Sequence, residues 1–330
     1  MAKNNNLHTA KATKNDEFYT QLEDIENELK YYKDYFKGKV VYCNCDGFLN
    51  EEKSNFFVYF SLNYEVFGLK GLICTKYNPN GKGRKYEYYG DLNGNNYPDE
   101  EEIFTSDLEG DGDFRSEECI ELLKKCDIVC TNPPFSLFRQ YIAQLFEYKK
   151  DFLIIGNKNA ISYKEVFPLI KENKMWVGVT PMGYDMRFYV TDAMAENLIK
   201  TKKEGSGYVI KEGKVYGRAQ ANWFTNLDHK KRHEELLLYK KYNTEEYPKY
   251  DNYDAIEVSK VTDIPMDYDG VMGVPITFLG KYCPEQFEIV DLNPHFFSMI
   301  AKGLPKPKQL SLQNVNRKDP YARVLIKRIS

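Results

Sequence analysis

Short apolar runs alternate with amphipathic segments along the first part of the chain, to about residue 180. Apolar runs bounded by turn residues predict buried strands, whereas apolar positions three and four apart predict helices. Strands are expected at residues 39–43, 71–75, 127–130, 152–156 and 175–179. Helices are expected at residues 55–62, 117–125, 137–148 and 163–172. This alternation predicts an α/β fold, in which helices cover both faces of a mostly parallel sheet.

The regular pattern is interrupted in two places. The turn sequence NPNG at residues 78–81 predicts a hairpin that continues through residues 86–89. Beyond about residue 200 the alternation is lost, and turn-rich pieces such as DNYD at residues 251–254 appear. We therefore expect two domains, residues 1–200 and residues 201–330.

Composition describes an ordinary globular protein, with 42% hydrophobic and 29% charged residues. No apolar run reaches the roughly 18 residues that a membrane helix needs. The polar N-terminus lacks the apolar core of a signal peptide, so a cytoplasmic protein is expected. The seven cysteines form no CxxC pair and no metal-ligand spacing, which favours reduced thiols in the core over a metal site.

Charge is divided unevenly along the chain. Residues 1–150 carry 19 basic and 26 acidic side chains, a net −7, whereas residues 151–330 carry 27 and 23, a net +4. A solvated surface explains the basic groups of the second half about as well as a phosphate-binding face does. These groups are Lys200, Lys202, Lys203, Lys211, Lys214 and Arg218, and Lys302, Lys306, Lys308, Arg317, Lys318, Arg323, Lys327 and Arg328.

The candidate chemistry lies where the apolar run of residues 127–130 ends in the sequence TNPPF. A following proline biases Asn132 away from the α region, so its side chain can point into the edge of the sheet where ligands bind. Pro133 and Pro134 lack N–H groups, which leaves their carbonyls as acceptors. Phe135 adds a flat ring. This set suits a planar base with an exocyclic amine, and a structural Pro-Pro loop is the alternative.

At these residues the chain resembles the amino-directed S-adenosylmethionine-dependent methyltransferases, whose signature is [D/N/S]-P-P-[F/Y/W]. Phe18-Tyr19-Thr20 resembles the element that holds the methionine end of the cofactor in the DNA adenine-N6 branch. Gly112-Asp113-Phe114 resembles the element whose aspartate binds the cofactor adenine. Core packing for the first element, and a carboxylate at a helix N-terminus for Asp113, are the alternatives.

A closer similarity is to the EcoRI modification methylase family of adenine-specific DNA methyltransferases. It is carried by residues 14–21, 43–46, 156–160 and 271–278. One departure follows Asp46, where the sequence GFLN at residues 47–50 stands in place of the Asp-Pro that the family leads us to expect.

The resemblance implies a Rossmann-like methyltransferase domain at residues 1–200 and a target-recognition region at residues 201–330. The implied activity is methylation of N6 of a flipped-out adenine in double-stranded DNA, by a restriction-modification or orphan enzyme. A cognate restriction endonuclease is an implied partner, and no metal is expected. The implied catalytic residues are Asn132, Pro133, Pro134 and Phe135. The implied cofactor-binding residues are Phe18, Tyr19, Thr20, Cys43, Asn44, Asp46, Asp113 and Phe114. Asn157 and Lys158 are expected to flank the base, with a simple turn as the alternative.

Two other functions stay open on the sequence. Residues 107–118 place carboxylates at loop positions 1, 3, 5 and 12 and a glycine at position 6, as an EF-hand calcium loop does. A bulky Phe114 at position 8 and the lack of a clear entering helix count against calcium. The same fold could instead methylate RNA or a protein glutamine.

Overall fold

The computed structural model describes residues 19–45, 54–95, 97–305, 310, 312 and 322–329. The chain forms two compact units. Unit 1 comprises Met1–Lys158 and Tyr184–Leu227, and unit 2 comprises Asn159–Gly183 and Asp228–Ser330. The chain therefore passes into the second unit, returns, and leaves again, so the boundary expected near residue 200 falls inside unit 1.

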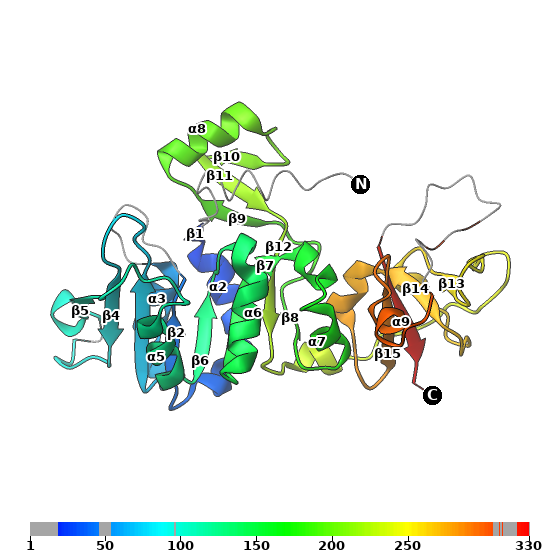
Figure 1. Ribbon diagram of the computed structural model, residues 1–330, viewed down its shortest axis with the longest axis horizontal. Helices are drawn as coiled ribbons and strands as arrows, with labels where there is room; N and C mark the ends of the chain where they lie inside the picture. Colours follow the sequence, from blue (N-terminus) through cyan, green and yellow to red (C-terminus); the bar gives the residue numbers. More distant parts are fainter. Residues whose placement is uncertain are drawn as a thin grey trace. The chain divides into compact units, whose positions relative to one another are not determined.

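A large sheet forms the centre of unit 1, with strand order β5-β4-β3-β2-β6-β7-β12 (Figure 1). Strands β2, β3, β6 and β7 are parallel, and β4, β5 and β12 run antiparallel to their neighbours. The predicted α/β class and the predicted hairpin, β3–β4, are confirmed. The strands are β2 (Val40–Cys43), β3 (Gly71–Lys76), β4 (Arg84–Tyr88), β5 (Phe104–Asp107), β6 (Ile128–Thr131), β7 (Asp151–Asn157) and β12 (Ala221–Thr225).

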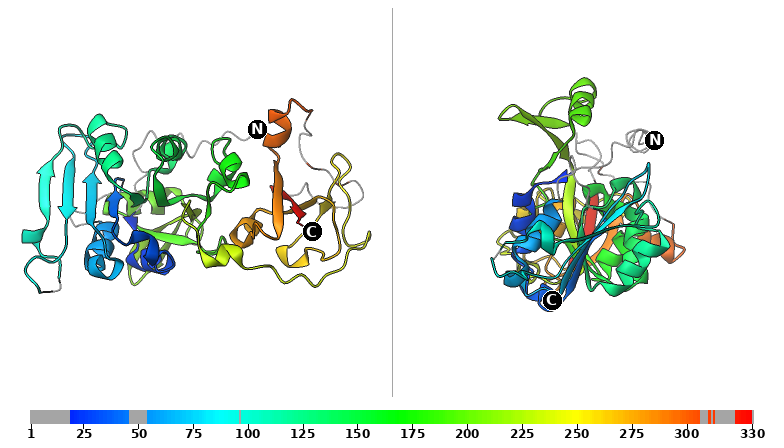
Figure 2. Two further views of the ribbon diagram at one scale, coloured as in Figure 1. Left: turned by 90° about the horizontal axis from the view of Figure 1, so that it is seen from below. Right: turned by 90° about the vertical axis from the view of Figure 1, so that its left-hand side faces the viewer.

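Helices cover both faces of this sheet, as the pattern predicted (Figure 2). Neighbouring residues of β12 show the two faces: Trp223 packs against Phe56 of α3, whereas Phe224 packs against Phe138 of α6. Side chains of successive strand residues point to opposite faces, so α3 and α6 lie on opposite sides. The helices of unit 1 around this sheet are α2 (Leu22–Leu29), α3 (Asn55–Leu62), α4 (Tyr64–Phe67), α5 (Glu117–Lys125) and α6 (Phe138–Glu147).

Local sequence explains where these helices begin and how closely they pack. Ser54 caps α3 and Ser116 caps α5, because each serine oxygen accepts from the backbone N–H three residues on. At the end of β7, a Cβ on Gly156 would lie 2.4 Å from the Phe138 ring. Only glycine therefore allows α6 to approach β7 this closely.

A second, smaller sheet of unit 1 was not predicted. It has the order β1-β9-β11-β10, all antiparallel. Its elements are β1 (Tyr19–Thr20), β9 (Met186–Tyr189), α8 (Asp192–Thr201), β10 (Tyr208–Lys211) and β11 (Lys214–Ala219). We call residues 186–219 the arm. In Figure 1 the arm stands above the edge at which β6 and β7 end, and α8 has no buried residue.

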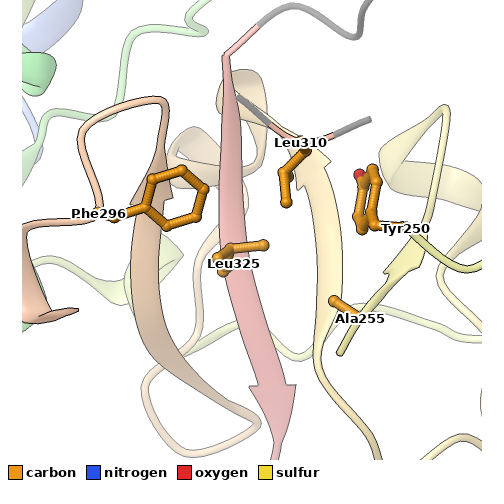
Figure 3. Close-up of a cluster of buried hydrophobic side chains, with 5 residues drawn as sticks. All are labelled: Tyr250, Ala255, Phe296, Leu310 and Leu325. Atoms are coloured by element: carbon orange, nitrogen blue, oxygen red, sulfur yellow. The ribbon is translucent and has the colours of Figure 1, made fainter. Parts of the chain in front are cut away.

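Unit 2 has a sheet of its own, with order β13-β14-β16-β15. Tyr250, Ala255, Phe296, Leu310 and Leu325 form a buried cluster beside it (Figure 3). The helix expected at residues 163–172 is shorter, because Pro168 at its second position fixes where it begins. The elements are α7 (Phe167–Lys171), β8 (Trp176–Val177), β13 (Ile256–Glu257), β14 (Met272–Pro275), β15 (Phe287–Asn293), α9 (Phe297–Ala301) and β16 (Arg323–Arg328).

Short 3-10 helices complete the described structure. They are η1 (Lys33–Phe36), η3 (Glu100–Glu102), η4 (Phe135–Leu137), η5 (Lys158–Ser162), η6 (Lys230–His233), η7 (Val261–Asp263) and η8 (Ile276–Lys281). Among the helices of the described ranges, none is both long enough and apolar enough to cross a membrane. None of the seven cysteines forms a disulfide, and all except Cys45 are buried.

Candidate active site

Three asparagines from distant parts of the chain lie at one edge of the large sheet. Asn44 follows β2, Asn132 follows β6, and Asn157 is the last residue of β7. Because these strands are parallel neighbours, their carboxyl ends meet at the same edge, which we call the rim. The Cys45 N–H donates to Thr131 Oγ1 over 3.1 Å, which ties the segment after β2 to the end of β6.

The Asn132–Phe135 loop is held firmly at the rim. Asn132 is 8% exposed and Phe135 is 7% exposed. Directly after Pro134, η4 begins, and the Leu137 N–H donates to the Pro134 carbonyl over 3.0 Å. Of the two proline carbonyls that the sequence suggested as acceptors, the one on Pro134 therefore already accepts one hydrogen bond within the loop.

Asn44 is buried beside the loop, with only 2% of its surface exposed. Its Oδ1 accepts a hydrogen bond from the hydroxyl of Tyr141, a residue of α6. Its Nδ2 has no hydrogen-bond partner among the described residues. A buried amide donor is thus left unsatisfied at the carboxyl end of β2, which is a costly arrangement unless a ligand completes it.

The other residues suggested for the cofactor are spread over several positions. Cys43 is fully buried in β2. Thr20 is buried, and its carbonyl accepts from Asn55 Nδ2 over 2.8 Å, while the backbone of Tyr19 pairs with Tyr189 of the arm. Phe18 and Asp46 lie outside the described residues, as does the GFLN sequence at residues 47–50.

Asp113 is bound by its near neighbour Arg115. The Arg115 side chain donates to both carboxylate oxygens, over 2.8 and 2.6 Å, and these bonds hold the pKa of Asp113 below its ordinary value. The helix cap of α5 is Ser116, so Asp113 does not cap that helix. Its neighbour Gly112 has φ +82°, and a Cβ there would lie 2.7 Å from the Lys76 carbonyl. The backbone therefore requires glycine next to Asp113.

Phe114 is a buried ring that α6 holds by two contacts. Its ring meets the Tyr141 ring edge-on, with centroids 5.0 Å apart. Its carbonyl accepts from Gln144 Nε2 over 3.2 Å. Phe114 and Asn44 thus share one helix as support, although they come from different parts of the chain.

Lys158 connects the rim to the base of the arm. Its Nζ donates to the Tyr184 carbonyl over 2.7 Å and lies 3.9 Å from Asp185 Oδ1. Arg218 of the arm also pairs with Asp185. Burial and the nearby Arg218 charge lower the pKa of Lys158. These contacts give Lys158 a tethering role in this structure, while its predicted contact with the base stays a prediction.

Three polar residues of the rim were missed on the sequence. Tyr141 and Gln144 occupy buried positions of an amphipathic helix and belong to no motif. Asn222 of β12 lies opposite Gly156, is fully buried, and neither end of its amide has a hydrogen-bond partner in the described part of the chain. An asparagine inside the buried strand Ala221–Thr225 was the one signal available.

The calcium alternative gains no support from the acidic loop at residues 107–118. Asp107 faces Arg84 over 3.4 Å, and Asp113 is bound by Arg115. Glu118 Oε2 accepts from the Glu109 N–H. Within the described ranges, no three His, Cys, Asp or Glu side chains gather as a set that could hold a metal ion.

Comparison with known proteins gives full-length matches. The family described as "Adenine-specific methyltransferase EcoRI" matches residues 6–329. The chain is 48% identical to the Type II methyltransferase M.EcoRI of Escherichia coli, over 99% of this chain and 97% of that protein. It is 39% identical to M.MgeORF184P of Mycoplasma genitalium, over 98% of each chain. It is also 39% identical to M.MpnI of Mycoplasma pneumoniae, over 97% of each.

No solved structure gives a significant match to the chain. The family match nevertheless spans both compact units and includes the whole rim. A methyl donor is required by any member of such a family. On the match and on these identities, the chain belongs to the EcoRI-type family of adenine-specific DNA methyltransferases.

Proposed function

We propose that this chain transfers a methyl group from S-adenosylmethionine to N6 of an adenine flipped out of double-stranded DNA. The observation that carries the proposal is the position of Asn132, at the carboxyl end of β6 and on the same rim as the buried Asn44. The relatives are named as Type II methyltransferases, which supports a role in restriction and modification. A cognate endonuclease acting on the same site is part of the proposal.

The residues at the rim fit S-adenosylmethionine as the methyl donor. The unsatisfied Nδ2 of Asn44 offers a buried donor to a ligand rich in oxygen acceptors. Asp113 offers a carboxylate to an adenine amine, and Phe114 offers apolar surface to a ring. We assign the cofactor to these residues together with the segment Tyr19–Thr20. When bound, this cofactor supplies an electrophilic methyl group on a sulfonium.

The chain's own groups explain how adenine becomes reactive. The N6 lone pair of adenine is delocalised into the ring, so the amine is a weak nucleophile. Asn132 Oδ1 and the Pro133 carbonyl accept its two hydrogens, which draws the nitrogen toward sp³ geometry and frees the lone pair. The Pro134 carbonyl accepts from the Leu137 N–H, which holds the loop, so we assign the second acceptor to Pro133. Phe135 supports the plane of the base and offsets part of the few kcal/mol that flipping costs.

The direct test is transfer of a tritiated methyl group from S-adenosylmethionine to duplex DNA, with RNA and protein as competing substrates. We expect incorporation into DNA, on adenine. Incorporation into RNA or protein alone would overturn the proposal. Methylome sequencing of a host that expresses the gene identifies the site, and a neighbouring endonuclease that cuts the same unmodified site would confirm the partner.

A further inference from the structure

We propose that Tyr141 is a positioning residue for the cofactor, acting through Asn44 and Phe114. The inference rests on the proposed function, since it assigns the rim to S-adenosylmethionine. Tyr141 lies in α6, directly after the Asn132–Phe135 loop and η4, and it is fully buried.

The Tyr141 hydroxyl fixes which end of the Asn44 amide is available. An asparagine amide has an accepting oxygen and a donating nitrogen, and a half-turn about its last bond exchanges the two. The hydroxyl donates to Asn44 Oδ1, so the oxygen end is occupied. The nitrogen end is left as a buried donor with no partner among the described residues. The Tyr141 hydroxyl thus leaves the Asn44 Nδ2 donor available at the rim.

The Tyr141 ring and Gln144, on the next turn of α6, hold the segment that carries Asp113 and Phe114. The Tyr141 ring meets Phe114 edge-on at 5.0 Å, an arrangement that aromatic pairs favour. Gln144, three residues further along α6, donates to the Phe114 carbonyl over 3.2 Å. One face of α6 therefore fixes the segment after β2 relative to the segment that carries Asp113 and Phe114.

The first test is Tyr141→Phe in the full-length chain, with S-adenosylhomocysteine titrated by calorimetry in the absence of DNA. The variant keeps the ring and loses only the hydroxyl, so Phe114 stays supported while the Asn44 amide becomes free to rotate. Loss of one aimed hydrogen bond predicts a Kd about five- to tenfold higher. We expect kcat at saturating cofactor to stay within about twofold of the parent value, because the chemistry at Asn132 is untouched.

Tyr32→Phe is the matched control. Tyr32 is also fully buried in unit 1, and its hydroxyl donates to a side chain, Glu28 Oε1, over 3.0 Å. A purely structural role for Tyr141 predicts similar losses of thermal stability in both variants and no change in Kd for either. An unchanged Kd in Tyr141→Phe would overturn the inference while leaving the proposed methyltransferase function in place.

Two Asn44 variants test whether Tyr141 acts through Asn44. If Tyr141 acts through Asn44, adding Tyr141→Phe to Asn44→Ala causes no further loss of affinity, whereas independent, multiplying losses would contradict that route. Asn44→Asp keeps an acceptor for the hydroxyl and removes the donor, so we expect it to bind as weakly as Asn44→Ala. If the parent chain itself binds neither S-adenosylmethionine nor S-adenosylhomocysteine, the inference and the proposed cofactor fall together.

Discussion

A single amide, that of Asn132, carries the chemistry of the proposed reaction. It follows β6 and begins the loop that η4 and the Pro134 carbonyl hold in place. Because the chain itself orders the backbone of this loop, we expect the acceptor to need little rearrangement at the moment of reaction. Preorganised groups of this kind typically contribute a factor of about 100 to 1,000 in rate.

Replacement of Asn132 by alanine should therefore slow turnover strongly without removing the cofactor. We expect kcat for Asn132→Ala to fall by about 100-fold or more, while the Kd for S-adenosylhomocysteine stays within about twofold. Single-turnover methylation and calorimetry measure the two quantities. Asn27→Ala, on the exposed face of α2, is the matched control and should change neither. A variant that keeps most of its activity would show that the role given to Asn132 is wrong.

A different residue, Asp24 of α2, couples stability to pH. Asp24 is 4% exposed, and the Tyr184 hydroxyl donates to one of its oxygens over 2.9 Å. The other oxygen has no partner within the described part of the chain. Burial raises the pKa of Asp24 to about 6. The native protein thus keeps a proton, between about pH 4 and pH 6, that the unfolded chain releases.

The sign of the effect follows from proton linkage. Because the native state binds more protons in this window, the free energy of unfolding decreases as pH rises through it and stays lowered above pH 6. Asp24→Asn keeps an acceptor for Tyr184 and carries no charge. We expect it to be more stable than the parent by about 1–3 kcal/mol at pH 7.5, with the difference vanishing near pH 4.

Urea unfolding at several pH values measures this difference. Glu26→Gln removes a carboxylate from an exposed position of the same helix that does not contribute to the pKa of Asp24, so it should leave the pH profile unchanged. The assignment to Asp24 is contradicted if Asp24→Asn loses its advantage toward high pH instead of toward low pH.

At the scale of elements, α6 is the support of the site. It begins directly after the Asn132–Phe135 loop and η4, contacts β7 through Phe138, and holds Asn44 and Phe114 through Tyr141. Its distance from β7 is set by Gly156, which has no side chain. Contact between this helix and this strand therefore decides where the rim residues stand.

A methyl group at residue 156 should disturb that contact. The Cβ of Gly156→Ala would lie 2.4 Å from the Phe138 ring, so the ring or the helix must shift. We expect a loss of about 1–3 kcal/mol in the free energy of unfolding, measured by chemical denaturation. Gly110→Ala is the control, since a Cβ there meets no atom within 4 Å and the residue has no positive φ. Equal stability of both variants would mean that α6 adapts without cost.

The sequence predicted most elements of the large sheet, because their periodicity is strong. The predicted helices at residues 55–62 and 117–125 agree with α3 and α5 residue for residue. The predicted strands correspond to β2, β3, β6 and β7 within one or two residues at each end. The arm and β12 were missed, because their residues follow a long excursion of the chain and their pairing partners are distant in sequence.

The candidate site was predictable only where a motif marked it. The NPPF sequence and the strand before it locate Asn132, and Cys-Asn-Cys-Asp locates Asn44. Tyr141 and Gln144 could not be recognised in this way. Their roles depend on contacts with Asn44 and Phe114, which are distant in sequence, and the helical pattern alone does not reveal such contacts. The contact of Lys158 with Asp185 could not be predicted for the same reason, because it joins segments that are distant in sequence.

At the scale of the whole molecule, the basic side chains indicate a surface for DNA. Of the two basic groups seen in the sequence, the first lies on the arm and at its exposed hairpin, which includes Lys211 and Lys214. The arm adjoins the rim, because the chain passes from the arm directly into β12, whose first residue, Ala221, pairs with Asn157. Half of the second basic group lies outside the described residues. We therefore expect the arm to contact DNA phosphates near the target base.

Charge reversal on the arm hairpin tests this expectation. Lys211→Glu with Lys214→Glu should weaken DNA binding and reduce the slope of log K against log salt by about 2, while cofactor affinity stays unchanged. Lys33→Glu with Lys37→Glu makes the same charge change at exposed positions before β2, at the opposite end of that strand from the rim. Equal salt slopes for the two double variants would remove the arm from the DNA-binding surface.

The pairing of β1 with β9 also limits when each sheet can form while the chain is being synthesised. Tyr19 pairs with Tyr189, and β7 pairs with a strand that begins only at Ala221. A chain emerging from the ribosome therefore has its first strand long before it has the partner of that strand. Sheet closure that spans so much sequence is entropically slow. Tyr19 and Thr20 must therefore wait for their partner strand until more than half of the chain has been synthesised.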